Sequence, residues 1–477
     1  MLPASFLRPA YVPPPAPDWN ELLNSAVLAL GPGRFERLYR RTCHTGLARG
    51  VWWELEGAKA PVPMVIRPRI LTREQRSYIR RVSWHVRCGL ERAAWLAARD
   101  PRAAALLPLD AEEREWFERF PPRRPAPAFC RLDATVGLGA DWRARLQFVE
   151  ANVVGIGGMT YAPVLERLAR AQVLPALARA GVAIPARRNA DPRELLLAEI
   201  LEHARRRGVT GRPTIALLDD RSLYAFGGEL GRQEARLRAR GFDALYLDPH
   251  ELEVSRSGDL SARGRRVDVC YRFITLADLV QLERRGQRLD GLRAAFARDM
   301  VLPGVGGDLE HKSVLELMTD STFRGAFDPL QQSAFDAHVL WTRLVQERRT
   351  TAPDGAEIDL LPWAAANQRR LVLKPNRLDG GEGVLFGAGC EAARWVQALH
   401  AAATCPGTQV VQAASPPDLE RFPRLRPSGD LQLDGLYTTT GLFPGRGGLG
   451  IFGRYAERRV VNICQGGGVL PMLVCDR

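Results

Sequence analysis

The stretch Leu371-Val-Leu-Lys-Pro-Asn-Arg-Leu-Asp-Gly-Gly-Glu-Gly-Val-Leu-Phe386 is the most informative part of this chain. Its first apolar run predicts a strand that delivers Lys374, and a glycine-rich turn and a second apolar run follow. Glycines let backbone N–H groups approach phosphate oxygens closely, and the lysine adds a positive charge. Because the lysine precedes the glycines and no Gly-Lys-Ser/Thr follows, this is not a Walker loop. The pattern predicts a nucleotide-phosphate site, and a plain glycine-rich β-hairpin is the alternative.

Lysine is rare in this chain, which gives weight to the few that occur. They are Lys59, Lys312 and Lys374, and arginine supplies all the other positions among the 67 Lys+Arg residues. A lysine retained in an arginine-rich chain indicates a site that needs a compact ammonium rather than a planar guanidinium. Lys312 lies in His311-Lys-Ser-Val-Leu-Glu-Leu-Met318, which we predict to be a helix. A solvated helix lysine is the alternative there.

The composition is that of a globular protein with two or three domains. The chain has 477 residues, of which 46% are hydrophobic and 25% charged. No apolar run is long enough to span a membrane, and the proline-rich leader at residues 1–18 lacks the apolar region of a signal peptide. We therefore expect a cytoplasmic protein without a membrane partner. The eight cysteines are scattered without zinc spacing, so we expect inert thiols.

The net charge of +13 raises the question of nucleic-acid binding. The arginines are spread along predicted helices, interleaved with glutamate and leucine, and no arginine-rich arm or nucleic-acid motif occurs. An anionic substrate such as ATP is a sufficient partner for the excess charge, so we expect no nucleic acid. The alternative, a basic nucleic-acid-binding protein, predicts strongly salt-dependent retention by DNA or RNA.

Two strands are predicted between residues 129 and 154, and they carry a second polar cluster. Side chains alternate faces along a strand, so Arg131 shares a face with Asp133, and Glu150 with Asn152. If the strands fold about residues 141–142, Asp133 faces Glu150 and Arg131 faces Asn152. Opposed carboxylates repel unless a cation lies between them, and Asp, Glu and Asn oxygens suit Mg²⁺. Arg131 could clamp a phosphoryl oxygen, and a salt-bridged polar sheet face is the alternative.

The region from Pro213 to Ile274 predicts an α/β unit of the open-sheet type, because buried strands alternate with a helix through short loops. Polar residues at its strand ends are weak ligand-site candidates: Asp219, Asp220 and Arg272. Further helices are predicted over residues 20–42 with a break at 31–33, and over 71–98, 163–180, 192–207, 226–240 and 394–403. Short strands alternating with glycine turns are predicted over residues 434–468.

Together these motifs resemble the circularly permuted ATP-grasp family, whose best-known relative is the synthetase module of glutathionylspermidine synthase. In such proteins the metal-binding strands precede the ATP lysines, as they do here. The resemblance covers about residues 130–470. It rests on Arg131-Leu-Asp133, Glu150-Ala-Asn152, Lys312, Lys374-Pro-Asn376, the Gly380 to Gly383 loop, Val410-Val-Gln412 and Arg454.

The resemblance implies an α/β (α+β) fold, in which a circularly permuted ATP-grasp follows an N-terminal helical region and includes a pre-grasp open-sheet α/β domain. The implied parts are an N-terminal helical region (1–120), the metal-binding part of the grasp (121–210), the pre-grasp α/β unit (211–300) and the ATP-binding lobes with the glycine-rich loop (301–477).

The resemblance also implies roles for individual residues. Asp133, Glu150 and Asn152 would hold Mg²⁺ on the ATP phosphates, and Arg131 would stabilise the transferring phosphoryl group. The residues that would contact ATP are Lys312, Lys374, Gly380, Gly381, Glu382, Gly383, Val384, Gln412 and Arg454. Gln412 stands where such proteins often have glutamate, so no particular adenine contact is carried over for its side chain.

The activity that the resemblance implies is an ATP-dependent carboxylate–amine ligase, which forms an amide bond through an acyl-phosphate and releases ADP and phosphate. Its partners would be a small-molecule or peptide carboxylate and an amine, whose identities the sequence does not reveal. A homodimer is an open option for its assembly. The alternative is an ATP-grasp-like nucleotide-binding protein without ligase activity, acting as a sensor or partner subunit.

Overall fold

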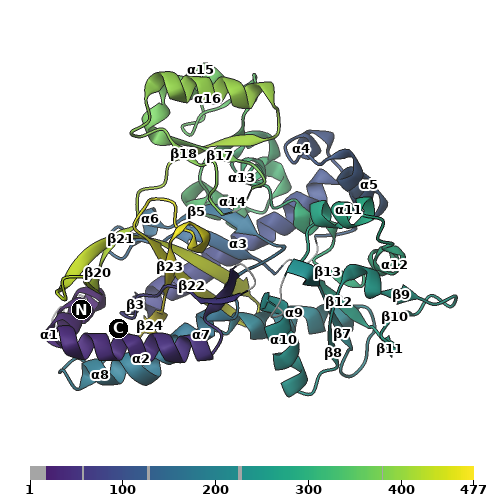
Figure 1. Ribbon diagram of the computed structural model, residues 1–477. Coiled ribbons are helices and arrows are strands. Elements are labelled where there is room, and N and C mark those ends of the chain that lie inside the picture. Colours follow the sequence, from purple (N-terminus) through teal and green to yellow (C-terminus); the bar gives the residue numbers. More distant parts are fainter. Residues whose placement is uncertain (1–17, 56–57, 126–128, 224–227, 379, 477) are drawn as a thin grey trace, which may run out of the picture.

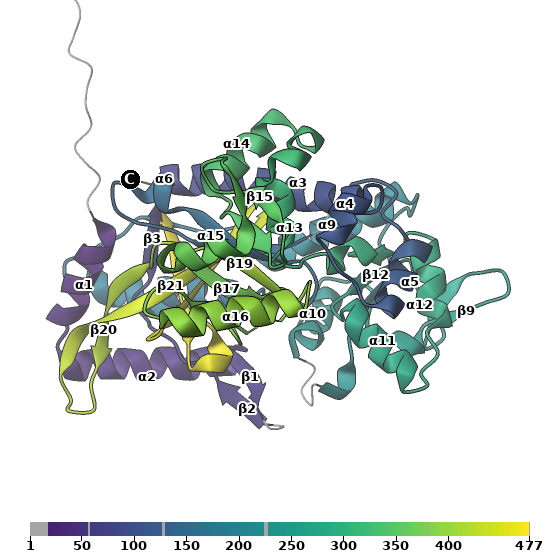
Figure 2. The same ribbon diagram turned by 90° about the horizontal axis from the view of Figure 1, so that it is seen from above.

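Figures 1 and 2 show the computed structural model, which describes residues 18–55, 58–125, 129–223, 228–378 and 380–476. The predicted leader, except for its last residue, lies outside these ranges. Asp18 caps α1 (Trp19–Ala29) by accepting hydrogen bonds from the first backbone N–H groups of the helix. α2 (Pro32–Ala48) follows Gly31, whose φ of 72° favours glycine, so the predicted helix break at residues 31–33 is confirmed.

The central sheet joins segments that are far apart in the sequence. Its order is β23-β22-β21-β4-β5, with β20 also paired to β21 (Figure 1). The strands are β4 (Arg131–Thr135), β5 (Gln147–Asn152), β20 (Leu419–Leu425), β21 (Leu431–Gly445), β22 (Gly448–Ala456) and β23 (Gly468–Leu470). α3 (Arg73–Ala97) and α9 (Pro192–Arg206) pack against β21 and β22, and α7 (Tyr161–Leu168) packs against β22.

The prediction of short strands and glycine turns over residues 434–468 was wrong. β21 runs unbroken for 15 residues and pairs along its C-terminal part with the nine residues of β22. The glycines within these strands mark close packing rather than turns. A Cβ at Gly450 would lie 2.7 Å from Cγ of Pro192, and one at Gly453 would lie 2.5 Å from Cδ1 of Leu470.

A smaller sheet lies above the central one in Figure 1, covered by two helices. Its order is β14-β19-β17-β18. Its parts are β14 (Thr342–Leu344), β17 (Leu371–Pro375), β18 (Leu385–Phe386), β19 (Gln409–Ala413), α15 (Leu360–Ala366) and α16 (Ala392–Thr404). Trp395 on α16 is fully buried in the core that these elements share. β17 and β18 pair antiparallel, so the glycine-rich stretch does form the hairpin that the sequence left open.

The predicted α/β unit has a parallel sheet with the order β13-β12-β7-β8. It contains β7 (Ile215–Leu218), α10 (Gly228–Ala239), β8 (Ala244–Leu247), β12 (Val269–Arg272), α11 (Leu276–Arg284), α12 (Asp290–Ala297) and β13 (Val301–Leu302). The strands are buried along their whole length, as expected for a parallel sheet with both faces covered. The first two residues of the helix predicted over 226–240 lie outside the described residues. An antiparallel sheet flanks the unit: β9 (Glu253–Val254), β10 (Leu260–Ala262) and β11 (Arg265–Arg266).

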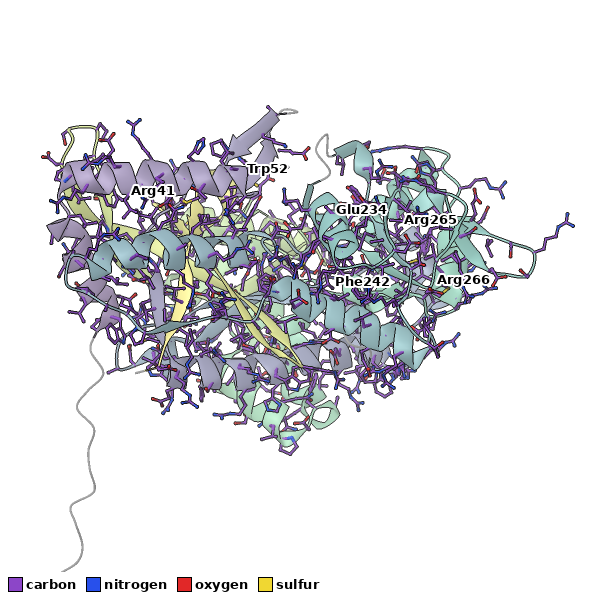
Figure 3. All side chains as sticks on the ribbon, turned by 90° about the horizontal axis from the view of Figure 1, so that it is seen from below. Arg41, Trp52, Glu234, Phe242, Arg265 and Arg266 are labelled. Carbon is purple, nitrogen blue, oxygen red and sulfur yellow. The ribbon has the colours of Figure 1, made fainter. Side chains whose placement is uncertain are left out.

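Figure 3 shows the molecule from below with its side chains as sticks, and three of the labelled residues are arginines. The labelled residues Arg41, Arg265 and Arg266 come from α2 and β11, which lie in different parts of this view. Arg265 pairs with Asp243 at 2.6 Å, and Arg266 with Asp268 at 3.2 Å. The arginines of β11 are therefore compensated locally.

The region over residues 1–120 is not purely helical. It also contains β1 (Trp52–Leu55), β2 (Ala58–Pro61) and β3 (Arg69–Thr72), together with the helices α4 (Pro101–Ala105) and α5 (Ala111–Arg119). β3 pairs in parallel with β24 (Met472–Cys475), which ties this region to the end of the described chain. The helix predicted from residue 71 begins at Arg73, because Leu71 and Thr72 belong to β3 and Thr72 forms a capping box with Gln75.

The helix predicted over residues 163–180 is interrupted by a π-helical turn at Ala169–Val173, between α7 and α8 (Leu174–Ala178). The remaining elements are α6 (Trp142–Arg145), β6 (Ala186–Arg187), α13 (Val314–Thr319), α14 (Pro329–His338), β15 (Arg349–Thr351) and β16 (Glu357–Asp359). Within the described residues, no helix combines the length and apolar character that a membrane crossing requires. The structure is thus a mixed α/β fold with several sheets, and the predicted domain boundaries stay predictions.

Candidate functional site

One cavity between the central and the small sheet collects most of the predicted site residues. It has a volume of about 150 Å³. Its lining includes Asp133, Glu150, Lys312, Lys374, Gly381, Glu382, Val384, Gln412 and Arg454. Arg131, Asn152, Gly380 and Gly383 do not line it, although the first two contact Asp133. Ligand pockets usually hold about 300–1,000 Å³, so a nucleotide would need the two sheets or the loop between them to open further.

The register predicted for the two strands is confirmed where it matters for the site. β4 and β5 pair antiparallel with Asp133 opposite Glu150 and Arg131 opposite Asn152, and a bulge then shifts the pairing. On the other side of β4, Asp133 lies opposite Gly441 of β21. A Cβ at Gly441 would lie 2.9 Å from Cδ of Arg131, so this strand position needs a glycine to make room for the arginine.

Asp133 is the centre of a buried salt-bridge network. Its side chain is 1% exposed, and the guanidinium of Arg131 contacts both carboxylate oxygens at 2.8 and 2.9 Å. Arg454, from β22, adds a contact of 2.7 Å to Oδ2. Burial alone would raise the pKa of Asp133, but the two guanidiniums hold that pKa well below its usual range. Asp133 is therefore a permanent anion that positions two arginines.

Arg131 uses its remaining donors to connect the network to its surroundings. Nη1 donates to the carbonyl oxygen of Gly157 at 2.8 Å, in the glycine-containing turn that follows β5. Nη2 donates to Oδ1 of Asn152 at 3.1 Å. The arrangement matches the salt-bridged polar sheet face that the sequence left as an alternative. In this structure Asn152 is oriented by Arg131, and its amide group is half-buried.

Glu150 is the more accessible carboxylate of the pair. Its side chain is 32% exposed, and Oε2 lies 3.8 Å from Nζ of Lys312. Burial and the negative charge of Asp133 raise its pKa, while the ammonium groups of Lys312 and Lys374 act against that rise. Glu150 thus lies beside two lysines and is only partly enclosed, so a further cation could reach its carboxylate.

Lys312 does not lie on a helix, contrary to the sequence-based prediction. It belongs to the turn that precedes α13, because its backbone N–H donates to the carbonyl oxygen of Asn376 at 2.9 Å. Asn376 is fully buried and also accepts from the backbone N–H of Ser313 through its side chain. These bonds fix the turn, and Nζ of Lys312 then donates to the carbonyl oxygen of Leu378 at 2.8 Å.

Lys374 is held by a neutral partner. Nζ donates to Oε1 of Gln412 at 2.7 Å, and no carboxylate among the described residues lies within ion-pair distance of it. The amide group of Gln412 is fixed in turn, because it donates to Oγ1 of Thr342 at 2.9 Å. Burial lowers the pKa of Lys374 to about 8, and Lys312 contributes to the lowering. Gln412 therefore orients the lysine without neutralising it.

The glycine-rich loop has the backbone conformation that its sequence predicts. Gly380, Gly381 and Gly383 have φ values of 74°, 72° and 69°, which favour glycine. The carbonyl oxygen of Gly380 accepts a hydrogen bond of 2.7 Å from Gln465. A Cβ at Gly381 would lie 2.3 Å from Cγ1 of Val460. The loop thus rests against the segment that follows β22 and closes one side of the cavity.

Several lining residues were missed by the sequence analysis. They are Thr135, Val149, Ser415, Asp418, Tyr437, Thr438, Thr439 and Arg459. Arg459 packs its guanidinium over the ring of Phe386 on β18, 4.9 Å from the ring centroid. In the sequence, the adjacent pair Arg458 and Arg459 is the one feature that could have marked Arg459 as a site residue. In an arginine-rich chain such a pair carries little information.

The polar residues at the strand ends of the α/β unit do not join this cavity. Arg272 is fully buried and pairs with Asp308 at 2.6 Å, which gives it a structural role. Asp219 is also buried, and its pKa is raised to about 7, chiefly by burial and also by the neighbouring Asp220. Neither residue is among those that line the cavity between the sheets.

The donor set fits a phosphate-bound magnesium ion better than a metal held by protein alone. Among the described residues, no group of three or more His, Cys, Asp or Glu side chains could hold a metal ion. Both oxygens of Asp133 are occupied by guanidiniums, and Oδ1 of Asn152 accepts a hydrogen bond from Arg131, which leaves Glu150 as the accessible carboxylate. Mg²⁺ usually takes one or two protein ligands and completes its shell with phosphates and water, which suits a site with one accessible carboxylate.

Comparison with known proteins defines the class of fold. No family model matches the chain, and a search of curated proteins finds no match. Among solved structures, the chain is similar to a glutathione synthetase-like effector from Globodera pallida in its apo form. The TM-score is 0.63, with 14% sequence identity, over 92% of this chain and 97% of that chain. The chain thus has a glutathione synthetase-like fold, while the circular permutation and the link to glutathionylspermidine synthase stay predictions.

Proposed function

We propose that this protein is an ATP-dependent carboxylate–amine ligase that uses the cavity between the two sheets. The observation that carries the proposal is the convergence of three cationic side chains, Lys374, Lys312 and Arg454, on one cavity. The ammonium of Lys374 has a neutral hydrogen-bond partner, Lys312 lines the same cavity, and Nε of Arg454 is buried without a hydrogen-bond partner among the described residues. Buried donors without acceptors are costly, so this side of the cavity is suited to an anion rich in oxygen atoms.

In the proposed reaction, an oxygen of the substrate carboxylate attacks the γ-phosphorus of ATP, and the bond to the ADP oxygen breaks. The amine nitrogen then attacks the acyl carbon, phosphate leaves and the nitrogen loses a proton. Such chemistry asks the protein for positioning and charge neutralisation rather than a nucleophile. Lys374 and Lys312 would hold the phosphates of ATP, and Arg454 would meet the developing negative charge through its open Nε.

The remaining residues would orient these groups. Magnesium would neutralise phosphate charge with Glu150 as a protein ligand, and Asn152 would join it by exchanging its hydrogen bond to Arg131 for the metal. Asp133 would hold Arg131 and Arg454 in place rather than bind the metal, which revises the role that the resemblance implies for it. Arg131 lies beside the metal ligands and would approach the transferring phosphoryl group when the cavity opens. The glycine-rich loop, from Gly380 to Val384, would cover the phosphates.

A nucleotide-binding protein without ligase activity is the second candidate, and one observation favours it. The guanidinium of Arg131 is fully engaged by Asp133, Asn152 and the carbonyl oxygen of Gly157. Binding of a nucleotide to the lysines alone would leave this network intact, whereas phosphoryl transfer to a carboxylate needs a cation near the acyl oxygen. The two candidates differ in whether ADP is released.

The first experiment measures the thermal midpoint with and without Mg·ATP. A ligand that binds only the folded state raises the midpoint by mass action. We expect a rise in the wild-type protein and a much smaller one in Lys374→Ala at the same concentration of Mg·ATP. Lys59→Ala is the matched control, because Lys59 is an exposed lysine on β2, above the ring of Trp52, and does not line the cavity. No rise at millimolar Mg·ATP would overturn the nucleotide site.

The second experiment screens carboxylates with amines for ADP release. Release that depends on both substrates supports the ligase, and release should be lost in Lys374→Ala. A protein that is stabilised by Mg·ATP but releases no ADP with any pair of substrates would support the nucleotide-binding candidate instead.

A further inference from the structure

A second and larger cavity lies where the helical region meets the α/β unit. It has a volume of about 570 Å³, within the range of small-molecule sites. Its walls come from α3, from the segment after α5, from α12 with β13, and from the loop between β13 and α13. Figure 1 shows α3, α5, α12 and β13 gathered on this side of the molecule. No residue lines both this cavity and the one between the sheets.

The walls of the larger cavity are mainly apolar. Leu90 and Ala94 come from α3, Phe296 from α12, and Val305 and Leu309 from the loop before α13. Apolar walls with a few placed polar groups are typical of sites that enclose the body of a small molecule.

Three arginines stand at the exposed side of this cavity. Arg119, Arg123 and Arg124 all line it and are exposed. Arg124 lies 3.7 Å from Asp299, whereas Arg119 and Arg123 form no ion pair with another described residue. Elsewhere the arginines of this protein often have a carboxylate at hand, as Arg265 and Arg293 do. The acidic residues that also line the cavity have partners of their own, because Glu91 pairs with Arg87, Asp299 with Arg124, and Glu310 accepts from the backbone N–H of Val154. The rim therefore holds two arginines without an ion-pair partner among the described residues.

The segment that carries these arginines is held in place. The guanidinium of Arg99 donates to the carbonyl oxygens of Pro122 and Arg123 at 2.9 and 3.3 Å. The ring of Phe120 stacks on Phe296, with centroids 5.6 Å apart and planes inclined by 24°. Because the backbone that carries these arginines is already fixed, it loses little conformational freedom when a ligand binds, and this favours affinity.

This cavity is not a second entrance to the nucleotide cavity. Val153, which lines it, follows directly on Asn152 at the end of β5, and side chains alternate faces along a strand. Glu310 lies between the two sites: its carboxylate accepts from the backbone N–H groups of Val153 and Val154 and lines the larger cavity. The end of β5 therefore separates a ligand in this cavity from the phosphate-binding lysines.

We propose that this cavity is a separate binding site for a small anion with an apolar body. The apolar part would be enclosed by the walls from α3 and α12, and the acidic group would bind Arg119 and Arg123 at the rim. The shared chemistry is a carboxylate, sulfonate or phosphate on an aliphatic or aromatic group. The proposal does not depend on the ligase activity.

The test uses the full chain and the fluorescent probe 1-anilinonaphthalene-8-sulfonate, which combines an aromatic body with a sulfonate. We expect saturable binding to one site, displaced by decanoate and not by decylamine, because only decanoate carries the right charge. Replacing both rim arginines, in Arg119→Ala/Arg123→Ala, should weaken binding at least about tenfold, the scale of losing one charged hydrogen bond. Arg265→Ala/Arg266→Ala on β11 is the matched control and should bind as the wild type does.

A cavity-filling variant tests the apolar part independently. Ala94→Phe places an aromatic ring from α3 in the cavity. We expect that this variant no longer binds the probe, and that decanoate no longer raises its thermal midpoint. Since the new ring could disturb folding, the thermal midpoint of Ala94→Phe is measured without ligand as well. The variant Arg119→Ala/Arg123→Ala changes exposed residues only and is the second test. Equal probe binding by the rim variant and the wild type, or equal displacement by decylamine and decanoate, would overturn the proposal.

Discussion

The two sheets that face each other across the cavity differ in the partners that they give to their charged side chains. On the central sheet, Arg131 and Arg454 both form an ion pair with Asp133, so each buried guanidinium has a carboxylate at contact distance. On the small sheet, Lys374 has Gln412 as its partner, which orients the ammonium and leaves its charge unbalanced. The difference indicates that the central sheet maintains its site without a ligand, whereas the small sheet gains a counter-charge when an anion binds.

The largest effect should come from removing the balancing charge on the central sheet. Asp133→Ala leaves two guanidiniums without a counter-ion at a buried position, and breaking a buried pair in this way costs about 3–5 kcal/mol. We expect the free energy of unfolding, measured in urea, to fall by that amount, and Mg·ATP binding to be lost. As a control, Asp336→Ala removes the partner of Arg324 from a surface pair of 2.7 Å and should change stability by less than about 1 kcal/mol. Equal effects of the two changes would contradict the comparison.

Removing the ammonium of Lys374 on the small sheet should weaken Mg·ATP binding without lowering the free energy of unfolding. Lys374→Met deletes a half-buried ammonium whose desolvation is not offset by an opposite charge at contact distance, so stability should stay the same or rise. Affinity for Mg·ATP, measured by calorimetry, should fall about tenfold to a hundredfold, because a charged hydrogen bond to phosphate is lost. A large loss of stability with unchanged affinity would show that Lys374 is a structural residue.

The pKa of Lys374 is lowered to about 8, so the difference in stability between the wild type and Lys374→Met should depend on pH. Below pH 8 the ammonium is charged in the folded and unfolded states, and its desolvation cost is fully present. As pH rises through about 8 towards the ordinary lysine value of about 10.4, the folded state loses its proton first, so the stability of the wild type should rise relative to Lys374→Met. Unfolding in urea over this range, with both proteins, measures the difference.

Nucleotide binding should respond to the same titration with the opposite sign. Phosphate favours the charged ammonium, so at about pH 9 Mg·ATP binding should take up protons and weaken as pH rises further. Calorimetry in two buffers of different ionisation enthalpy detects the proton uptake. Lys374→Arg is the control, because a guanidinium stays charged over this range; an equal uptake in that variant would assign the proton to another group.

The smallest effect is expected at Lys312. Its ammonium lies 3.8 Å from Glu150 and so shares its charge with a carboxylate, unlike Lys374. Lys312→Met should therefore lower the affinity for Mg·ATP several-fold, less than Lys374→Met does. Calorimetric titration of Lys312→Met and Lys374→Met with Mg·ATP shows which lysine contributes more to the affinity. A greater loss from Lys312→Met would show that the lysine paired with a carboxylate is the main phosphate contact.

Local sequence determined a large part of this architecture. The alternation of side chains along a strand placed Arg131 beside Asp133, and a fold about residues 141–142, assumed from the sequence, brought Glu150 opposite Asp133. The α/β unit was readable because its strands are continuous apolar runs. The positions of Gly380, Gly381 and Gly383 were readable as well, since a positive φ favours glycine.

Only the tertiary structure decided how these groups are used. Arg454 reaches Asp133 because β22 and β21 pair far along the chain from β4, and this pairing makes Asp133 an anchor for arginines rather than a free carboxylate. The length of β21 was hidden because glycines in a strand look like turns until the packed neighbours are seen. Lys312 left its predicted helix for a turn fixed by Asn376, a contact between distant segments. Sequence thus set the local geometry, while the pairing of distant charges, which governs pKa and availability, required the folded chain.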